Sequence, residues 1–224
     1  MTGSGAEDGE VSAEAIDRKF RSETRLRAEG VPFFAMLPVI ETAAEALIRT
    51  KEEIALRTLC VALVAAKGEG LAQDIVENVL DVHELRPHLT PSETVFVFDQ
   101  SPSQDDRLQF SWKHEAVWTL LWALGFVEQL GKPTEICDVE FAARTVTERT
   151  THQFIEDSRL RPIADILDQA DLIYRYHWAV TNARVKGQQI PAGLNPGVTY
   201  ERHYALNWLI GYNEQAWDDI TTDT

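Results

Sequence analysis

The stretch that decides the fold is residues 111–131, SWKHEAVWTLLWALGFVEQLG. Its apolar residues cover every side of a helical wheel, and a helix that is apolar all round lies either in a protein core or in a membrane. The apolar run at 116–127 is interrupted by a threonine and a glycine and is too short to cross a bilayer. The stretch therefore predicts a buried central helix at about 112–130, with the first serine as its N-cap and the last glycine as its end.

Helix signals recur along the rest of the chain, and no convincing strand alternation accompanies them. Two capping boxes, Thr50 with Glu53 and Thr90 with Glu93, mark helix starts. The VFVF run after the second box has strand propensity, but the cap is the more specific signal and favours a helix. We expect helices at about 13–28, 51–68, 71–82, 91–98, 112–130, 138–149, 162–186 and 199–210.

The fold class that follows is all-α, a single multi-helix globular domain spanning 13–224 around the central helix. Residues 1–12 have no apolar periodicity and are expected to form a disordered tail. An isolated indole, Trp217, lies near the end of the chain among acidic residues. We expect it to pack back onto the domain, because in water it would expose a large apolar surface.

Composition excludes several classes of function. The net charge of −15 argues against nucleic acid and anionic membranes as partners, since neutralising phosphates requires clustered lysine and arginine. A basic protein partner fits this charge better. The two cysteines, Cys60 and Cys137, are expected to be reduced thiols of a cytoplasmic protein. The acidic, glycine-containing N-terminal residues predict no secretory signal.

Motifs for metal or nucleophilic chemistry are absent from the sequence. None of the six histidines has a glutamate three residues before it, as a ferritin-like di-iron site requires. A metalloprotease helix HExxH begins at His114, but Trp118 stands where the second histidine belongs. Cys137 beside Asp138 is more typical of a buried structural thiol than of a nucleophile. We therefore expect no metal and no cofactor, and enzymatic activity remains open.

The remaining candidate is a constellation of charged and aromatic residues on the predicted central helices. Arg57 is the only charged residue between positions 54 and 66. Burying its guanidinium without a partner would cost roughly several kcal/mol of stability. We expect it to pair with Glu115, Asp171 or Glu201. Asp171 and Arg175 have the i, i+4 spacing of a helical ion pair. The candidate site residues are Arg57, Glu115, Asp171, Arg175, Trp178, Glu201 and Arg202, interleaved with Trp122 and Trp208.

Six segments resemble a family without a known function: EEIALR (52–57), HEAVWTLLWALG (114–125), EICDV (135–139), ILDQADLIYRYHWA (166–179), ERHYALNWLIG (201–211) and WDDITTDT (217–224). The family is an uncharacterised bacterial one, in the four-thousand series of domains of unknown function, and a C-terminal Trp-Asp is its most recognisable mark. The resemblance covers nearly the whole chain and implies a single domain. It implies no activity, cofactor or catalytic residue.

Two functions are consistent with these observations. The favoured one is a cytosolic interaction protein, an adaptor or an inhibitor, whose acidic surface binds a basic protein partner. In that case the constellation is a buried ion network that fixes how the helices pair. The alternative is a small-ligand-binding protein or an enzyme that uses the constellation. A deep pocket lined by Glu115, Arg175 and Glu201 would favour the alternative. The oligomeric state is left open.

Overall fold

The computed structural model describes residues 12–224, and every regular element in that range is a helix, which confirms the all-α prediction. The predicted disordered tail lies, apart from Ser12, outside the described residues. The helices in chain order are α1 (Ala13–Ala28), α2 (Lys51–Gly68), α3 (Gln73–Val82), η1 (Arg86–His88), α4 (Pro91–Phe98), α5 (Gln104–Ser111), α6 (His114–Ala123), α7 (Val139–Thr147), α8 (Thr151–Asp157), α9 (Ile163–Val185), η2 (Pro191–Gly193), α10 (Pro196–Ile210), η3 (Tyr212–Glu214) and η4 (Trp217–Asp219).

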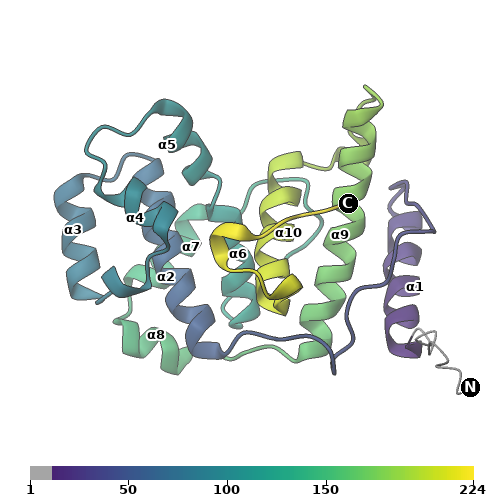
Figure 1. Ribbon diagram of the computed structural model, residues 1–224, viewed down its shortest axis with the longest axis horizontal. Helices are drawn as coiled ribbons and strands as arrows, with labels where there is room; N and C mark the ends of the chain where they lie inside the picture. The colour runs from purple at the N-terminus through teal and green to yellow at the C-terminus, as the bar shows by residue number, and fades with distance from the viewer. Residues whose placement is uncertain (1–11) are drawn as a thin grey trace, which may run out of the picture.

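The helices form two groups joined through α6 (Figure 1). In one group α2 packs against α3, α4, α5 and α8. In the other, α9 packs against α10 and α1. Helix α6 contacts both α2 and α10, and every residue in it except Trp118 is buried. The prediction that the fold is built around a buried helix in this region is therefore confirmed, although its boundaries differ.

The predicted helix at 112–130 is wrong at both ends. Ser111 is the last residue of α5, which begins after the capping serine Ser103, and α6 starts only at His114. At the other end α6 stops before Gly125, whose φ of +82° turns the chain out of the helix. The amide of Phe126 then donates to the carbonyl of Leu121 at 3.0 Å, the bond of a Schellman motif.

A neighbouring segment explains why the helix ends there. The amides of Arg159 and Arg161 donate to the carbonyls of Leu124 and Ala123 at 2.8 and 2.9 Å. These bonds satisfy carbonyls that would otherwise be left unpaired at the end of α6. A Cβ atom on Gly125 would lie 2.9 Å from the carbonyl oxygen of Arg159. Glycine is therefore needed at this position both for its positive φ and for the close approach of the crossing chain.

The capping boxes form as predicted. In α2 and α4 the threonine side chain accepts from the backbone of the glutamate three residues on, and that glutamate accepts from the threonine backbone. The VFVF run is accordingly helical, and only its second and third residues are buried. A third box, with Thr150 and Gln153, starts α8.

The C-terminal segment packs onto both groups of helices. Trp217 is buried, with its ring edge-on to Tyr204 and to Trp208 at centroid distances of 5.1 and 5.3 Å. The hydroxyl of Tyr204 donates to the carbonyl of Trp217. The next residue, Asp218, accepts hydrogen bonds from the amide and hydroxyl of Ser92 at the start of α4. The prediction that Trp217 packs back onto the domain is confirmed.

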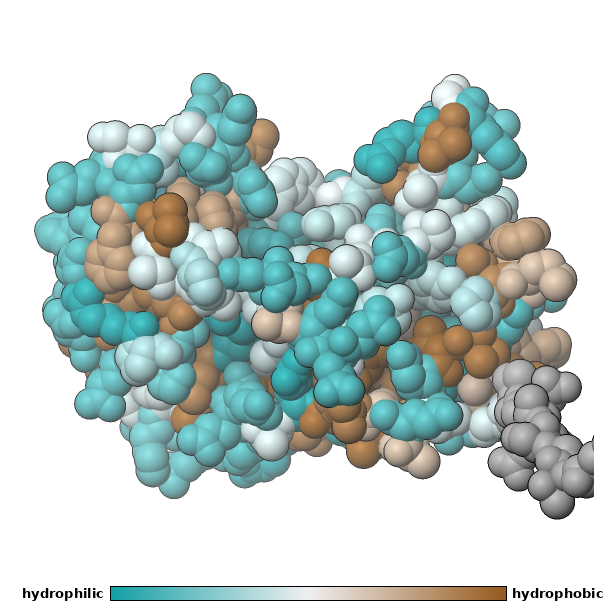
Figure 2. Space-filling view, viewed as in Figure 1, coloured by the Kyte–Doolittle hydropathy of each residue, from teal (hydrophilic) through white to brown (hydrophobic). Residues whose placement is uncertain are grey.

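The face of the molecule shown in Figure 2 is mainly hydrophilic, and apolar residues interrupt it in separate patches. Among residues 12–224, no helix combines the length and the apolar character needed to cross a membrane.

Candidate functional site

Arg57 does not pair with any of the three carboxylates predicted for it. Its partner is Glu93, with Nη2 2.5 Å from Oε2, and the two side chains are 7% and 3% exposed. The guanidinium also lies 5.3 Å from the ring centroid of Trp217. The prediction that Arg57 forms a buried ion pair is confirmed, but the predicted partners are wrong, because the second capping box places the Glu93 carboxylate against α2.

Glu115 is a buried residue in the first turn of α6. It accepts from the backbone amide of Cys137 and from Nε of Arg202, the latter at 3.3 Å. Arg202 also donates to the carbonyls of Leu130 and Gly131 at 2.7 and 3.2 Å. Burial raises the pKa of the Cys137 thiol and lowers that of Arg202. This cluster fastens α6, α10 and the turn after α6.

Asp171 and Arg175 form the i, i+4 pair expected within α9. Both are fully buried, with two parallel bonds of 2.9 and 2.7 Å. Arg175 also donates to the carbonyl of Pro38, and Glu23 on α1 lies 3.8 Å away. Trp178, one turn further along, stacks on Phe34 instead of joining the pair.

The charged members of the predicted constellation are therefore distributed over separate, mostly buried ion pairs. Glu201, which pairs with Lys113 at 3.0 Å, is the only acidic member that lines a cavity large enough for a ligand. Within the part of the chain that the structure describes, no cavity is lined by Glu115, Arg175 and Glu201 together, and a buried ion network that fixes how the helices pair fits the other charged members.

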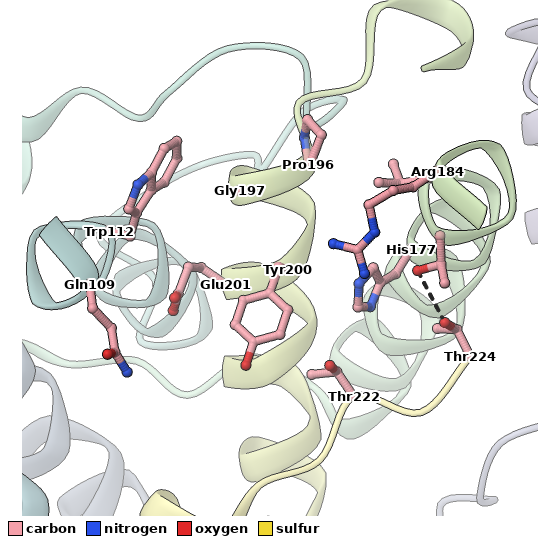
Figure 3. A pocket seen from close by; sticks show the side chains of 12 residues that line it. Gln109, Trp112, His177, Arg184, Pro196, Gly197, Tyr200, Glu201, Thr222 and Thr224 are labelled. Carbon is pink, nitrogen blue, oxygen red and sulfur yellow. Dashed lines mark hydrogen bonds between the residues drawn. The ribbon is translucent and has the colours of Figure 1, made fainter. Parts of the chain in front are cut away.

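Two cavities lie along the cleft between α9 and α10. One, of about 470 Å³, lies over the second half of α9 and the first turns of α10 (Figure 3). Another, of about 370 Å³, lies over the first half of α9 and the end of α10. Thr224, whose hydroxyl donates to that of Thr181 at 3.3 Å, lines both, so the C-terminal segment crosses the cleft between them.

Two histidines stand between these cavities. His177 of α9 lines the larger cavity and His203 of α10 lines the smaller one, and their Nδ1 atoms are 2.8 Å apart. Burial lowers the pKa of His177 to about 4 and that of His203 well below its usual value. The positive charge of Arg184 lowers the pKa of His177 further. Both rings are therefore neutral at pH 7.

The short distance between the rings fixes their relation. One Nδ1 must carry the proton and the other must accept it, so the two imidazoles have opposite tautomers. The donating ring has a lone pair on Nε2, and the accepting ring has its proton there. A proton taken up by the first Nε2 can pass through the Nδ1 pair and leave from the second Nε2, after which the tautomers are exchanged. The arrangement is able to carry out general acid–base chemistry in the cleft.

The wall of the larger cavity carries charge of both signs. In Figure 3 the guanidinium of Arg184 lies beside the His177 ring, and Tyr200 and Glu201 come from α10. Arg184 forms no ion pair with the carboxylates of residues 12–224, whereas Glu201 is bonded to Lys113. Burial raises the pKa of Glu201. Arg184 is thus the charged group in this wall that is available to a ligand.

The first turn of α10 is positioned by a close packing contact. The side chain of Asn195 caps the helix by accepting hydrogen bonds from the amides of Gly197 and Val198. The helix therefore begins at Pro196, three residues before the predicted start at 199. A Cβ on Gly197 would lie 2.5 Å from Cζ3 of Trp112, so only glycine allows the indole to reach the helix. This contact sets the edge of the cavity opposite α9.

Sequence reasoning missed the histidine pair. His177 fits the apolar stripe of its helix, and His203 lies within a run of residues that are buried on every side. Neither position has the spacing of a motif, and the pair arises only because α9 and α10 cross at these residues. Buried histidines on two long helices were the only available signal.

The comparisons with known proteins add a family and no activity. Within residues 12–224, no group of three or more histidine, cysteine, aspartate or glutamate residues is arranged to hold a metal ion. No curated protein and no solved structure matches the chain. A family model described as Domain of unknown function (DUF4272) matches residues 18–220, which is most of the chain, and the protein belongs to that family.

Proposed function

We propose that this protein binds a small anionic molecule in the cleft between α9 and α10 and exchanges a proton with it through His177. The observation that carries the proposal is the position of Arg184, a cation without an ion-pair partner in residues 12–224, beside a neutral histidine in the wall of a cavity of about 470 Å³. Ligand sites have volumes of about 300–1,000 Å³ and few, convergent polar groups, and this cavity has both properties.

The chemistry of the wall favours a carboxylate or a phosphate. A guanidinium presents parallel N–H donors that match the oxygens of either group. The hydroxyl groups of Thr181 and Thr222 line the same cavity and add neutral donors. The half-exposed ring of Tyr200 supplies an apolar surface next to them, against which the remainder of the molecule can lie.

Anion titrations of the full chain test this proposal. We would titrate inorganic phosphate, acetate and benzoate at pH 7 and low salt, using calorimetry and [¹⁵N]histidine spectra. We expect at least one anion to bind and to shift the Nε2 resonance of His177. Arg184→Gln should weaken binding at least tenfold.

Lys186→Gln is the matched control, because it removes the same charge from an exposed residue of the same helix end that does not line the cavity. Equal weakening by Lys186→Gln and Arg184→Gln would mean that the anion responds only to net charge. The absence of binding by all three anions would contradict the proposal.

A second candidate function is that of a cytosolic adaptor or inhibitor whose acidic surface binds a basic protein partner. The four exposed carboxylates of residues 212–224, a segment without lysine or arginine, support the basic partner. The two free, buried cysteines support a cytoplasmic location. Binding of a lysine-rich test peptide that weakens with salt, and that Asp219→Asn reduces, is the expected result. A peptide affinity that does not change in Asp219→Asn would exclude this segment as the contact surface.

A further inference from the structure

A separate cavity of about 230 Å³ lies in the group of helices around α2, between α2, α3, α6 and α7. Its wall is almost entirely apolar, in contrast with the cleft described above. The side chains that define its sides are Leu63, Val79, Val117 and Val146.

Small residues create the space. Four of the lining positions on α2 and α7 are alanines, Ala62, Ala66, Ala142 and Ala143, so at these positions the wall ends at Cβ atoms. The space is a recess that opens to solvent beside α7, where the lining residues Ala143 and Thr147 are exposed. An apolar cavity of about 150 Å³ holds benzene, so a recess about half as large again has room for a bicyclic ring.

His83 lies at the edge of this cavity, and its hydrogen bonds with Thr151 fix which ring nitrogen carries the proton. The hydroxyl of Thr151 donates to the carbonyl of His83 at 3.1 Å, and the same oxygen lies 3.2 Å from Nδ1 of that histidine. A hydroxyl has a single proton, so its oxygen must accept from Nδ1–H. Burial lowers the pKa of His83, which keeps the ring neutral at pH 7. Its remaining nitrogen, Nε2, therefore carries a lone pair and can only accept.

The other histidine in the wall has a different neighbour. Nε2 of His114 lies 3.3 Å from a carboxylate oxygen of Glu69 and is buried, without the alignment of a hydrogen bond. His83 is thus the group at the edge of the cavity whose acceptor is free to bind a ligand. A charged ligand would lose its hydration against the apolar wall without gaining a counter-charge, so a neutral one is favoured.

We propose that this cavity binds a small, neutral, aromatic or bicyclic molecule that carries a single N–H or O–H donor, with its ring between the alanine faces of α2 and α7 and its donor on Nε2 of His83. The compound class is that of indoles and phenols. This site does not depend on the cleft between α9 and α10.

The test compares indole with indene, which has the same shape but lacks the N–H group. Calorimetry and amide spectra of the full chain should show that both bind, and that indene binds about two- to tenfold more weakly, the range for one neutral hydrogen bond. His83→Phe should lower the affinity for indole to that for indene and leave indene unchanged. Affinities for indole and indene that are equal in the wild type would refute the role of His83.

Filling the cavity tests its location. Ala66→Leu and, closer to the surface, Ala143→Leu should each reduce binding of indole and indene more than tenfold. Ala164→Leu, at an exposed position of α9, is the matched control and should change neither affinity. The two filling variants differ in burial, so at least the exposed one should keep the fold. Binding that persists in Ala143→Leu and in any folded Ala66→Leu protein, or the absence of indole binding by the wild type, would overturn the proposal.

Discussion

The ion pair of Arg57 and Glu93 provides the sharpest test of how the core is held together. Both side chains are nearly excluded from water, and Nε of Arg57 is buried without a partner, so the guanidinium relies on this one carboxylate. Removing one member of a buried pair leaves an uncompensated charge and costs about 3–5 kcal/mol. For a domain of this size that corresponds to a fall in Tm of roughly 6–20 °C.

The variants can be chosen to isolate the charge. Arg57→Met keeps the unbranched apolar part of the side chain and removes the charged guanidinium. Glu93→Gln keeps an oxygen for the amide of Thr90, so the capping box survives while the charge is lost. We expect each single variant to be strongly destabilised and the double variant to cost little more than one of them. The difference is a coupling free energy of about 3 kcal/mol, measured by urea unfolding in a double-mutant cycle.

A second pair serves as the control. Arg86 and Glu77 are 2.7 Å apart but 41% and 40% exposed, and the cycle of Arg86→Met and Glu77→Gln should show no measurable coupling. If the effects of Arg57→Met and Glu93→Gln simply add, or if their coupling equals that of the exposed pair, the reasoning from desolvation is refuted.

Three further predictions follow from single features of the structure. Trp217→Ala should lower the free energy of unfolding, measured in urea, by about 3–5 kcal/mol, whereas Met36→Ala, at an exposed position, should have no effect. Equal unfolding curves for the two variants would mean that the indole is not packed. Between pH 6.5 and 4 His177 becomes protonated in the unfolded chain but stays neutral in the folded protein, where its pKa is about 4, so acidification should lower the free energy of unfolding by about 3 kcal/mol. Replacing His177 and His203 by glutamine should therefore flatten the pH profile of Tm, and an unchanged slope would contradict this prediction. Gly125→Ala should lower Tm by several degrees more than Gly30→Ala, because both have positive φ but only Gly125 has a backbone atom within 3 Å of the added Cβ; similar losses would show that the close approach is relaxed.

Local signals were sufficient for much of the fold. Each capping box depends on two residues three positions apart, and both predicted boxes form, including the one that overrides the strand propensity of VFVF. The end of the central helix was not predictable in the same way. Gly125 and Gly131 both have positive φ, and the choice between them depends on the chain at Arg159, which crosses the helix end from a distant part of the sequence.

The candidate site shows the same division. The pair of Asp171 and Arg175 lies within one helix and was predicted from its spacing. The partner of Arg57 was missed because Glu93 had already been assigned a capping role, and one carboxylate accepts both bonds. The pair of His177 and His203 depends on the crossing point of two helices, for which spacing along the chain contains no information.

The C-terminal segment also determines when the protein can complete its fold during synthesis. Arg57 and Ser92 belong to the early part of the chain, but both contact residues near its C-terminus. The indole of Trp217 covers Arg57, and the carboxylate of Asp218 binds Ser92. At about 5–20 residues per second, the roughly 125 residues between Ser92 and Trp217 take about 6–25 s to be made. For that time the surface of α2 and α4 that receives this segment is exposed on the nascent chain, where a chaperone can reach it.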